Sequence, residues 1–202
     1  MRTEQEKKLE FIVEMIIDDY PEPQFLIVDK MKEYYEEWWR SVSTDFTDFT
    51  TIVLGSDKQN PVEISCHEQH IEEPKIPWDQ DQIRMANKNP FGGEFTIEFD
   101  RDGDYEIEVS RWPFESNLMI NEAVAGIKAT LTTNKIPEGK ALNFKKAILK
   151  IGSWKDEKVV ENNAKSVLFK GNFKKGKSNL SSYFIDENKI EWGAFYFRIT
   201  RK

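Results

Sequence analysis

The chain's only cysteine lies beside both of its histidines, in the segment Ser65–His70. Thiolate and imidazole groups are zinc ligands, and three of them plus water make a catalytic zinc site. A cysteine and a histidine can also form a nucleophile–base pair. Cys66 and His67 are adjacent, however, so on a strand they would point to opposite faces. The segment therefore predicts a strand end entering a polar loop, with no metal bound and no catalytic residue.

The acidic segment Asp100–Asp104 is similar in composition to a calcium-binding loop. An EF-hand loop needs glycine at its sixth position and glutamate at its twelfth. Here Gly103 is fourth and Arg111 is twelfth. Alternating apolar residues flank the segment on both sides, and Asp-Gly is a hairpin signal. The pattern predicts a plain hairpin turn.

Other catalytic patterns are not distinctive. Aspartate and glutamate number 36, so no single carboxylate pair stands out as an acid–base couple. The sequence contains no G-x-S-x-G elbow. Phe91-Gly92-Gly93 is two glycines at the start of an expected strand, not a phosphate-binding loop.

Two tryptophans are candidate ligand-binding residues. Arg111-Trp112-Pro113 follows an expected strand, and Trp78 lies in the step Pro77–Gln80. A tryptophan beside an arginine on a sheet rim can stack on a sugar ring while the arginine binds hydroxyls or sulfate. The alternative is a core or rim tryptophan beside a solvated arginine. We carry Trp78, Arg111 and Trp112 forward as candidates.

The first of the elements that must position these residues is a helical region. Residues 4–43 carry apolar side chains at helical spacing, and 18–23 interrupts them with two prolines. We expect a first segment, a turn, and a second helix from about 23 to 42. The apolar residues are Leu9, Ile12, Val13, Ile16 and Ile17, then Val28, Met31, Tyr35, Trp38 and Val42.

The end of the second helix is unusually aromatic. Successive helix positions point about 100° apart, so Trp39 widens the face that Tyr35 and Trp38 form. A lone helix cannot bury such a face. Tyr35, Trp38 and Trp39 are therefore predicted interface residues.

After residue 43 the apolar period changes to two, which is typical of strands with one buried face. The clearest cases are 95–99, 105–109 and 195–199, and Trp154 and Trp192 are expected to pack against strands. Further candidates are 51–54, 62–66, 127–132, 144–151, 164–173 and 179–185, with 67–90 as a long polar loop. Many short strands separated by turn signals predict a mainly β protein, an antiparallel β-sandwich or jelly roll. We expect a helical segment at 1–43 and a β-sandwich domain at 44–202.

Composition excludes several classes of partner. The 202 residues carry a formal net charge of −7, which disfavours nucleic acid and anionic membranes. The first ten residues are mostly charged and lack the apolar core of a signal peptide. No run approaches the length of a membrane span.

Several short segments form a series along the chain. They are Tyr35–Trp39 with Val42-Ser43, Ile52–Ser56, Asn60–Val62, Pro77–Gln80, Gly103–Val109, Arg111–Pro113 and Gly193–Phe197. In this order they resemble the end of bacterial sulfatases of the arylsulfatase type, whose tail has a helix ending in a Trp-Trp pair, glycine-bounded strands and an R-W-P step. The resemblance covers residues 23–202.

The resemblance implies a role without catalysis. A sulfatase's chemistry lies in an N-terminal α/β domain with a Cys-x-(Pro/Ala)-x-Arg signature and a calcium site. Here Cys66 is followed by His67-Glu68-Gln69-His70, so the signature is absent and no catalytic residue is carried over. The sequence motif that precedes the aromatic helix in this family is also missing from residues 1–22.

We therefore expect a non-catalytic C-terminal β-sandwich region, without a cofactor, that supports a sulfatase catalytic domain and the sulfated-glycan cleft. The Trp-Trp helix would be the hinge between the two, and a periplasmic or extracellular location would follow. The alternative is a free-standing carbohydrate-binding module. A third hypothesis is an enzyme with its site at Cys66, His67 and His70.

Overall fold

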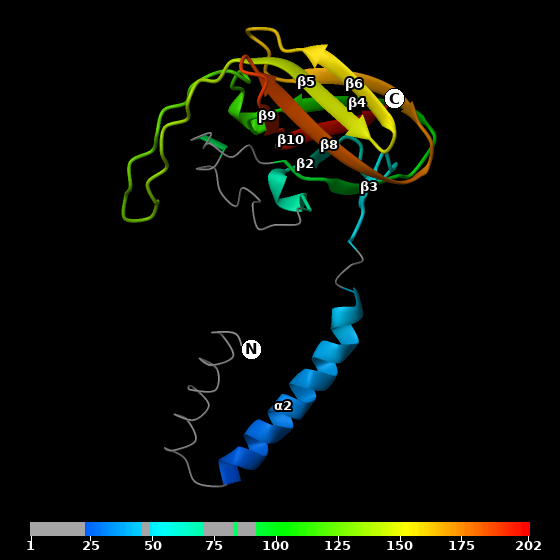
Figure 1. Cartoon of the computed structure of the whole chain (residues 1–202), viewed down its shortest axis with the longest axis vertical. Helices are drawn as coiled ribbons and strands as arrows, with labels where there is room; N and C mark the ends of the chain where they lie inside the picture. The colour runs from blue at the N-terminus through cyan, green and yellow to red at the C-terminus, as the bar shows by residue number, and fades with distance from the viewer. Residues whose placement is uncertain (1–22, 46–48, 71–82, 85–91) are drawn as a thin grey trace. The chain divides into compact units, whose positions relative to one another are not determined.

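The computed structural model describes residues 23–45, 49–70, 83–84 and 92–202 (Figure 1). The chain divides into two units, Met1–Phe49 and Thr50–Lys202. The domain boundary expected after residue 43 stays a prediction. The first helical segment and Trp78 lie outside the described residues.

The described part of the first unit is the helix α2 (Pro23–Val42), followed by the short 3-10 helix η1 (Ser43–Asp45). The predicted second helix is thus confirmed. Proline suits the first position of a helix, because an N–H group there would have no intrahelical acceptor and its absence costs nothing. Arg40 in the last turn interacts favourably with the helix dipole, and the Ser41 hydroxyl donates to the Trp38 carbonyl at 2.7 Å.

The second unit contains two sheets. The six-stranded sheet has the order β1-β3-β8-β5-β6, with β9 also paired to β8. Its pairs are antiparallel except β1 with β3, which is parallel. Its strands are β1 (Ile52–Leu54), β3 (Phe95–Phe99), β5 (Phe144–Ile151), β6 (Trp154–Val159), β8 (Gly176–Asp186) and β9 (Glu191–Gly193).

The four-stranded sheet has the order β2-β10-β4-β7 and is antiparallel throughout. Phe197 of β10 lies opposite both Ile64 of β2 and Val109 of β4. Short 3-10 helices η2 (Cys66–Glu68) and η3 (Phe114–Ser116) follow two of its strands. The strands are β2 (Val62–Ile64), β4 (Gly103–Ser110), β7 (Val167–Phe173) and β10 (Tyr196–Arg201).

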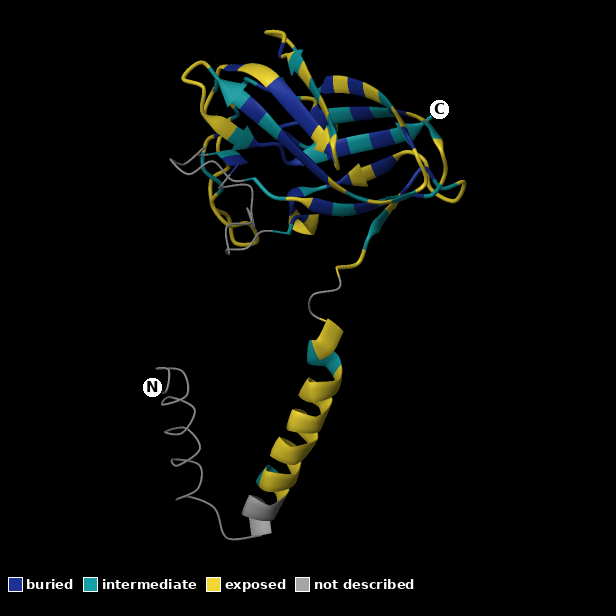
Figure 2. Cartoon of the chain, turned by 45° about the vertical axis from the view of Figure 1, so that its right-hand side comes forward, coloured by how far each residue is buried: buried dark blue, intermediate teal, exposed yellow. Residues whose placement is uncertain are grey.

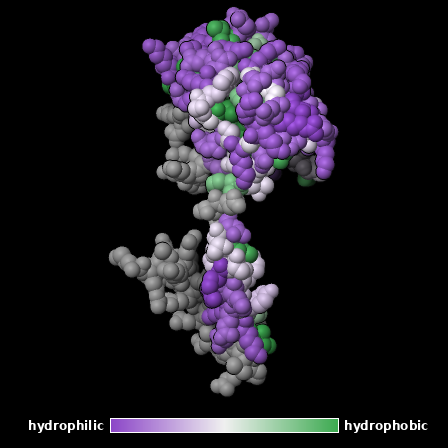
Figure 3. Space-filling view, turned by 90° about the vertical axis from the view of Figure 1, so that its right-hand side faces the viewer, coloured by the Kyte–Doolittle hydropathy of each residue, from purple (hydrophilic) through white to green (hydrophobic). Residues whose placement is uncertain are grey.

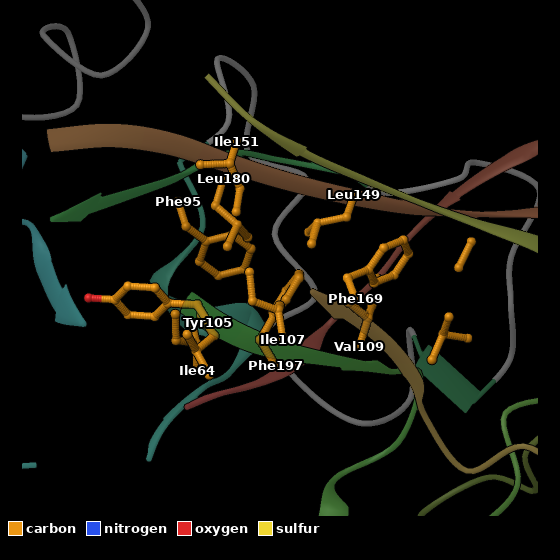
Figure 4. Packing of buried hydrophobic residues seen from close by; sticks show 14 of the residues in the cluster. Ile64, Phe95, Tyr105, Ile107, Val109, Leu149, Ile151, Phe169, Leu180 and Phe197 are labelled. Carbon is orange, nitrogen blue, oxygen red and sulfur yellow. The ribbon is translucent and has the colours of Figure 1, made fainter. Parts of the chain in front are cut away.

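The main core lies between the two sheets, which confirms the β-sandwich prediction. Figure 4 shows side chains of both sheets meeting there. Phe95 and Phe197 pack edge to face with ring centroids 5.1 Å apart. The alternation of buried and more exposed residues along strands such as β3 is visible in Figure 2. Trp154 and Trp192 pack against this core, as expected.

The hairpin predicted at Asp102-Gly103 is wrong. β3 and β4, on either side of it, belong to different sheets. The segment is instead an arch between the sheets, and the β7–β8 connection makes a second arch beside it. The Asp102 carboxylate ties them together, because it accepts from the Lys175 N–H at 2.7 Å and the Lys174 ammonium at 2.9 Å. These hydrogen bonds hold the pKa of Asp102 below its usual value.

Three further differences concern weakly patterned strands. β6 and β9 were not predicted, because β6 is almost all charged and β9 has only three residues. Residues 127–132 form no strand. Ile127 makes an isolated bridge with Ile136, next to a second bridge between Val124 and Gly139, and the side chains of 127–132 are exposed.

The face of the sandwich seen in Figure 3 is mainly hydrophilic, with small hydrophobic patches. Among the described helices, none is both long and apolar enough to cross a membrane.

Candidate functional site

Arg111 and Trp112 lie inside the molecule. Their exposed fractions are 2% and 1%. Trp112 belongs to a second, smaller core with Cys66, Ile83 and Phe195. Its ring is tightly enclosed, because a Cβ added at Gly139 would come within 2.9 Å of it. This placement corresponds to a core tryptophan.

The Arg111 guanidinium donates hydrogen bonds to backbone carbonyls of three separate segments. It donates to Lys140 at 3.0 Å, to Ile83 at 3.3 Å and to Ile120 at 3.4 Å. It also lies 4.2 Å from the centre of the Trp112 ring, a cation–π distance. Burial lowers the pKa of Arg111 to about 9, so it remains charged at neutral pH.

These contacts give the pair a structural role. Arg111 holds loops together over the end of β4, and it is not a solvated arginine. Neither side chain offers an exposed face on which a sugar ring could stack. Ligand binding by Arg111 and Trp112 therefore has no support in their geometry, and Trp78 is outside the described residues.

Cys66 is also part of the smaller core. Its side chain is 1% exposed, and burial raises the pKa of the thiol to about 11. A thiolate is the nucleophilic and metal-binding form of cysteine. The neighbouring His67 is exposed, so the thiol and the imidazole lie in different environments. This geometry argues against the nucleophile pair considered for the segment.

The aromatic residues of α2 form a cluster on the helix. The Tyr35 ring lies 5.7 Å from the Trp38 ring and 6.2 Å from the Trp39 ring, with which it is stacked. The three side chains are 52%, 47% and 41% exposed. Figure 2 shows how much of α2 is exposed along its length. An interface role for these three residues stays a prediction.

A hollow of about 440 Å³ lies where β2, η2, η3 and β10 meet, and we call it the β2–η3 groove. Its lining mixes aromatic rings, carboxylates and an imidazole. The lining residues are Glu63, Ile64, Ser65, His67, Glu68, Pro113, Phe114, Glu115 and Tyr196.

Local structure fixes two of the groove's carboxylates. Glu68 closes a capping box, because its Oε2 accepts from the Ser65 N–H at 2.9 Å and the Ser65 hydroxyl at 2.7 Å. Glu63 accepts from the Nε–H of Arg198 at 2.8 Å. The same guanidinium stacks on the Phe114 ring at 4.2 Å. Glu115 is exposed and has no partner among the described residues.

One signal in the sequence concerns a single residue of this groove. Phe197 and Ile199 alternate with Tyr196 and Arg198 along β10, which indicates that Tyr196 and Arg198 share the outward face. Phe114 and Glu115 carried no such signal, because they follow the proline that ends the strand pattern. Only the fold brings these residues beside Glu63 and Glu68.

Comparisons with known proteins identify no family. No known protein-family profile matches the chain, and no curated protein matches it. Among solved structures, it is similar to a ruminal GH26 endo-β-1,4-mannanase, with 9% identity and a TM-score of 0.36. That match covers 71% of this chain and 26% of the mannanase. This chain thus spans about a quarter of that enzyme's length.

Proposed function

We propose that this chain is the C-terminal β-sandwich module of a sulfatase-like sulfuric ester hydrolase, and that it supports the catalytic domain without catalysing a reaction itself. The proposal rests on the sequence segments that resemble the sulfatase tail. Its structural support is that several of these segments contact one another and hold demanding positions in the sandwich.

The contact between Gly55 and Tyr105 illustrates this support. Gly55 has a φ of +71°, a region that suits glycine. A Cβ there would lie 2.5 Å from the Tyr105 hydroxyl. The Tyr105 hydroxyl in turn donates to the Arg101 carbonyl at 2.8 Å. Two segments that are far apart in sequence thus require each other.

Asn60 gives a second example. Its side-chain amide donates to the Arg201 carbonyl, and its oxygen accepts from the Arg201 N–H, both at 2.9 Å. This pair continues the β2–β10 ladder beyond Val62. Arg111, which holds three loops together, is a third. Residues with such roles would recur wherever this sandwich is used, whatever its ligand.

The non-catalytic part of the proposal follows from the candidate residues. Cys66 is buried with a raised thiol pKa, and Arg111 is committed to backbone carbonyls. The predicted interface of Tyr35, Trp38 and Trp39 would face the catalytic domain. Sulfated glycan would then be bound mainly by that domain.

Two measurements test this function. Sequencing the DNA upstream of the Met1 codon should reveal an in-frame α/β domain with the Cys-x-(Pro/Ala)-x-Arg signature. The purified chain should not hydrolyse p-nitrophenyl sulfate. A stop codon and a ribosome-binding site just upstream of Met1 would contradict the first part, and hydrolysis the second.

A free-standing carbohydrate-binding module remains the second candidate. The observation that favours it is the β2–η3 groove, which combines aromatic rings with hydrogen-bond acceptors. This candidate no longer depends on Arg111 and Trp112, which are buried. It differs from the first in predicting that the chain works without a catalytic partner.

A further inference from the structure

We propose that the β2–η3 groove binds an uncharged saccharide. This site does not depend on the sulfatase proposal, since either a sulfatase tail or a free-standing module could use it. The hollow of about 440 Å³ falls within the roughly 300–1,000 Å³ typical of small-molecule sites. Its aromatic rings, its hydrogen-bond acceptors and its charge all suit such a ligand.

The aromatic rings suit the apolar face of a sugar. Phe114 and Tyr196 both line the groove, and each is half-buried. The guanidinium of Arg198 stacks on the Phe114 ring at 4.2 Å and helps to hold it in place. A ring fixed before binding loses little conformational freedom when the ligand arrives. Phe114 is therefore the expected stacking residue.

The carboxylates suit sugar hydroxyls, which are hydrogen-bond donors. An ionised carboxylate is an acceptor only and has sites for about four hydrogen bonds. Ser65 uses two of these on Glu68, and Arg198 uses one on Glu63. Acceptor capacity thus remains on two carboxylates that the protein already orients. Glu115 adds a third that has no partner among the described residues.

The charge of the lining selects against anions. Three glutamates line the groove, and Arg198, which contacts two of the lining residues, is already engaged with Glu63, Glu108 and the Phe114 ring. A sulfate or uronate group would lie among these carboxylates, and none of the described lining residues is a lysine or arginine that could compensate its charge. The groove is therefore matched to a neutral stretch of glycan, even if the rest of that glycan is sulfated.

Isothermal titration of the full chain with a set of hexasaccharides tests the proposal. The neutral probes are cellohexaose, mannohexaose, xylohexaose, laminarihexaose and neoagarohexaose. The charged probes are a sulfated carrageenan hexasaccharide and a chitosan hexamer. We expect at least one neutral probe to bind saturably, with a Kd of roughly 0.1–1 mM, and more tightly than the sulfated probe.

Variants then place the binding in the groove. Phe114→Ala should weaken binding about tenfold through loss of stacking. Glu115→Gln should weaken it about fivefold, because a neutral acceptor replaces a charged one. Glu161→Gln and Tyr34→Ala, which change exposed residues outside the groove, should leave the Kd unchanged. Thermal melting of each variant checks that the fold is intact.

Three results would overturn the proposal. The first is the absence of saturable binding by any neutral probe. The second is tighter binding of the sulfated probe than of every neutral one. The third is wild-type affinity in both groove variants while binding persists. None of these would bear on the gene context that tests the sulfatase proposal.

Discussion

The segment Arg111–Glu115 has an inner and an outer half. Arg111 and Trp112 point inward and join loops and a small core, whereas Phe114 and Glu115 line the open groove. The segment around η2 repeats the division, with Cys66 inside and His67 outside. In both segments the residues that looked most able to do chemistry are the buried ones. Residue type shows what a side chain can bind, but its direction decides whether a ligand or the protein itself is bound.

Truncating Trp112, the largest of the inward side chains, should lower the free energy of unfolding more than any other change. Trp112→Ala should destabilise the fold by about 4 kcal/mol, because it leaves a cavity in the small core. Urea unfolding followed by far-UV circular dichroism measures this. Trp112→Phe, which keeps an aromatic ring in the core, should lower the free energy of unfolding clearly less than Trp112→Ala. A stable Trp112→Ala protein that has lost only ligand binding would instead make Trp112 a binding residue.

Arg111→Met should cost about 3 kcal/mol, because it leaves three buried carbonyls without their charged donor. Methionine keeps much of the side-chain volume, so the loss reflects the hydrogen bonds more than packing. The same unfolding assay applies, with the exposed Arg101→Met as a control. Equal stability of Arg111→Met and the wild type would show that the carbonyl contacts contribute nothing.

The Cys66 thiol should react slowly in the folded protein. Its pKa of about 11, against an ordinary value of 9.0, leaves about 100-fold less thiolate at pH 8, and burial restricts access further. Reaction with Ellman's reagent should therefore be at least that much slower in buffer than in urea. Because the folded pKa is raised, the folded-state rate should keep rising with pH above 9. Equally fast reaction in both conditions would place Cys66 at the surface.

The outer half should tolerate substitution. Phe114→Ala should change stability by about 1 kcal/mol or less, since the ring is half-buried and its main described contact is the stack with Arg198. Differential scanning calorimetry of Phe114→Ala and Trp112→Ala under the same conditions compares their stabilities directly. If Phe114→Ala unfolded the protein as readily as Trp112→Ala, the division between the two halves would disappear.

Sequence reasoning predicted the elements with a strong period and missed those without one. The α2 helix and the strands around 95–99, 105–109 and 195–199 were found, because their apolar residues mark one buried side. The edge strand β6 was missed, since both of its faces carry charged residues and no apolar alternation marks a buried side. The Asp102-Gly103 turn was misread because local turn chemistry is the same for a hairpin and for an arch between sheets.

The site was harder to predict than the fold. Four consecutive residues, Val109 to Trp112, are all buried, which breaks the alternation that would have placed Arg111 and Trp112 on opposite faces. Burial here comes from other segments of the chain, at Ile83, Ile120 and Lys140. The groove is likewise assembled from three stretches of chain. No spacing within one stretch encodes either arrangement.

The most direct test of this account is a ¹⁵N NMR titration of the chain with the neutral hexasaccharide that binds best. The account predicts saturating amide shifts at Glu63, Glu68, Phe114, Glu115 and Tyr196, all of which line the groove. Shifts centred instead on the Arg111 loops at Ile120 and Lys140 would contradict it, because the buried half would then be the ligand site.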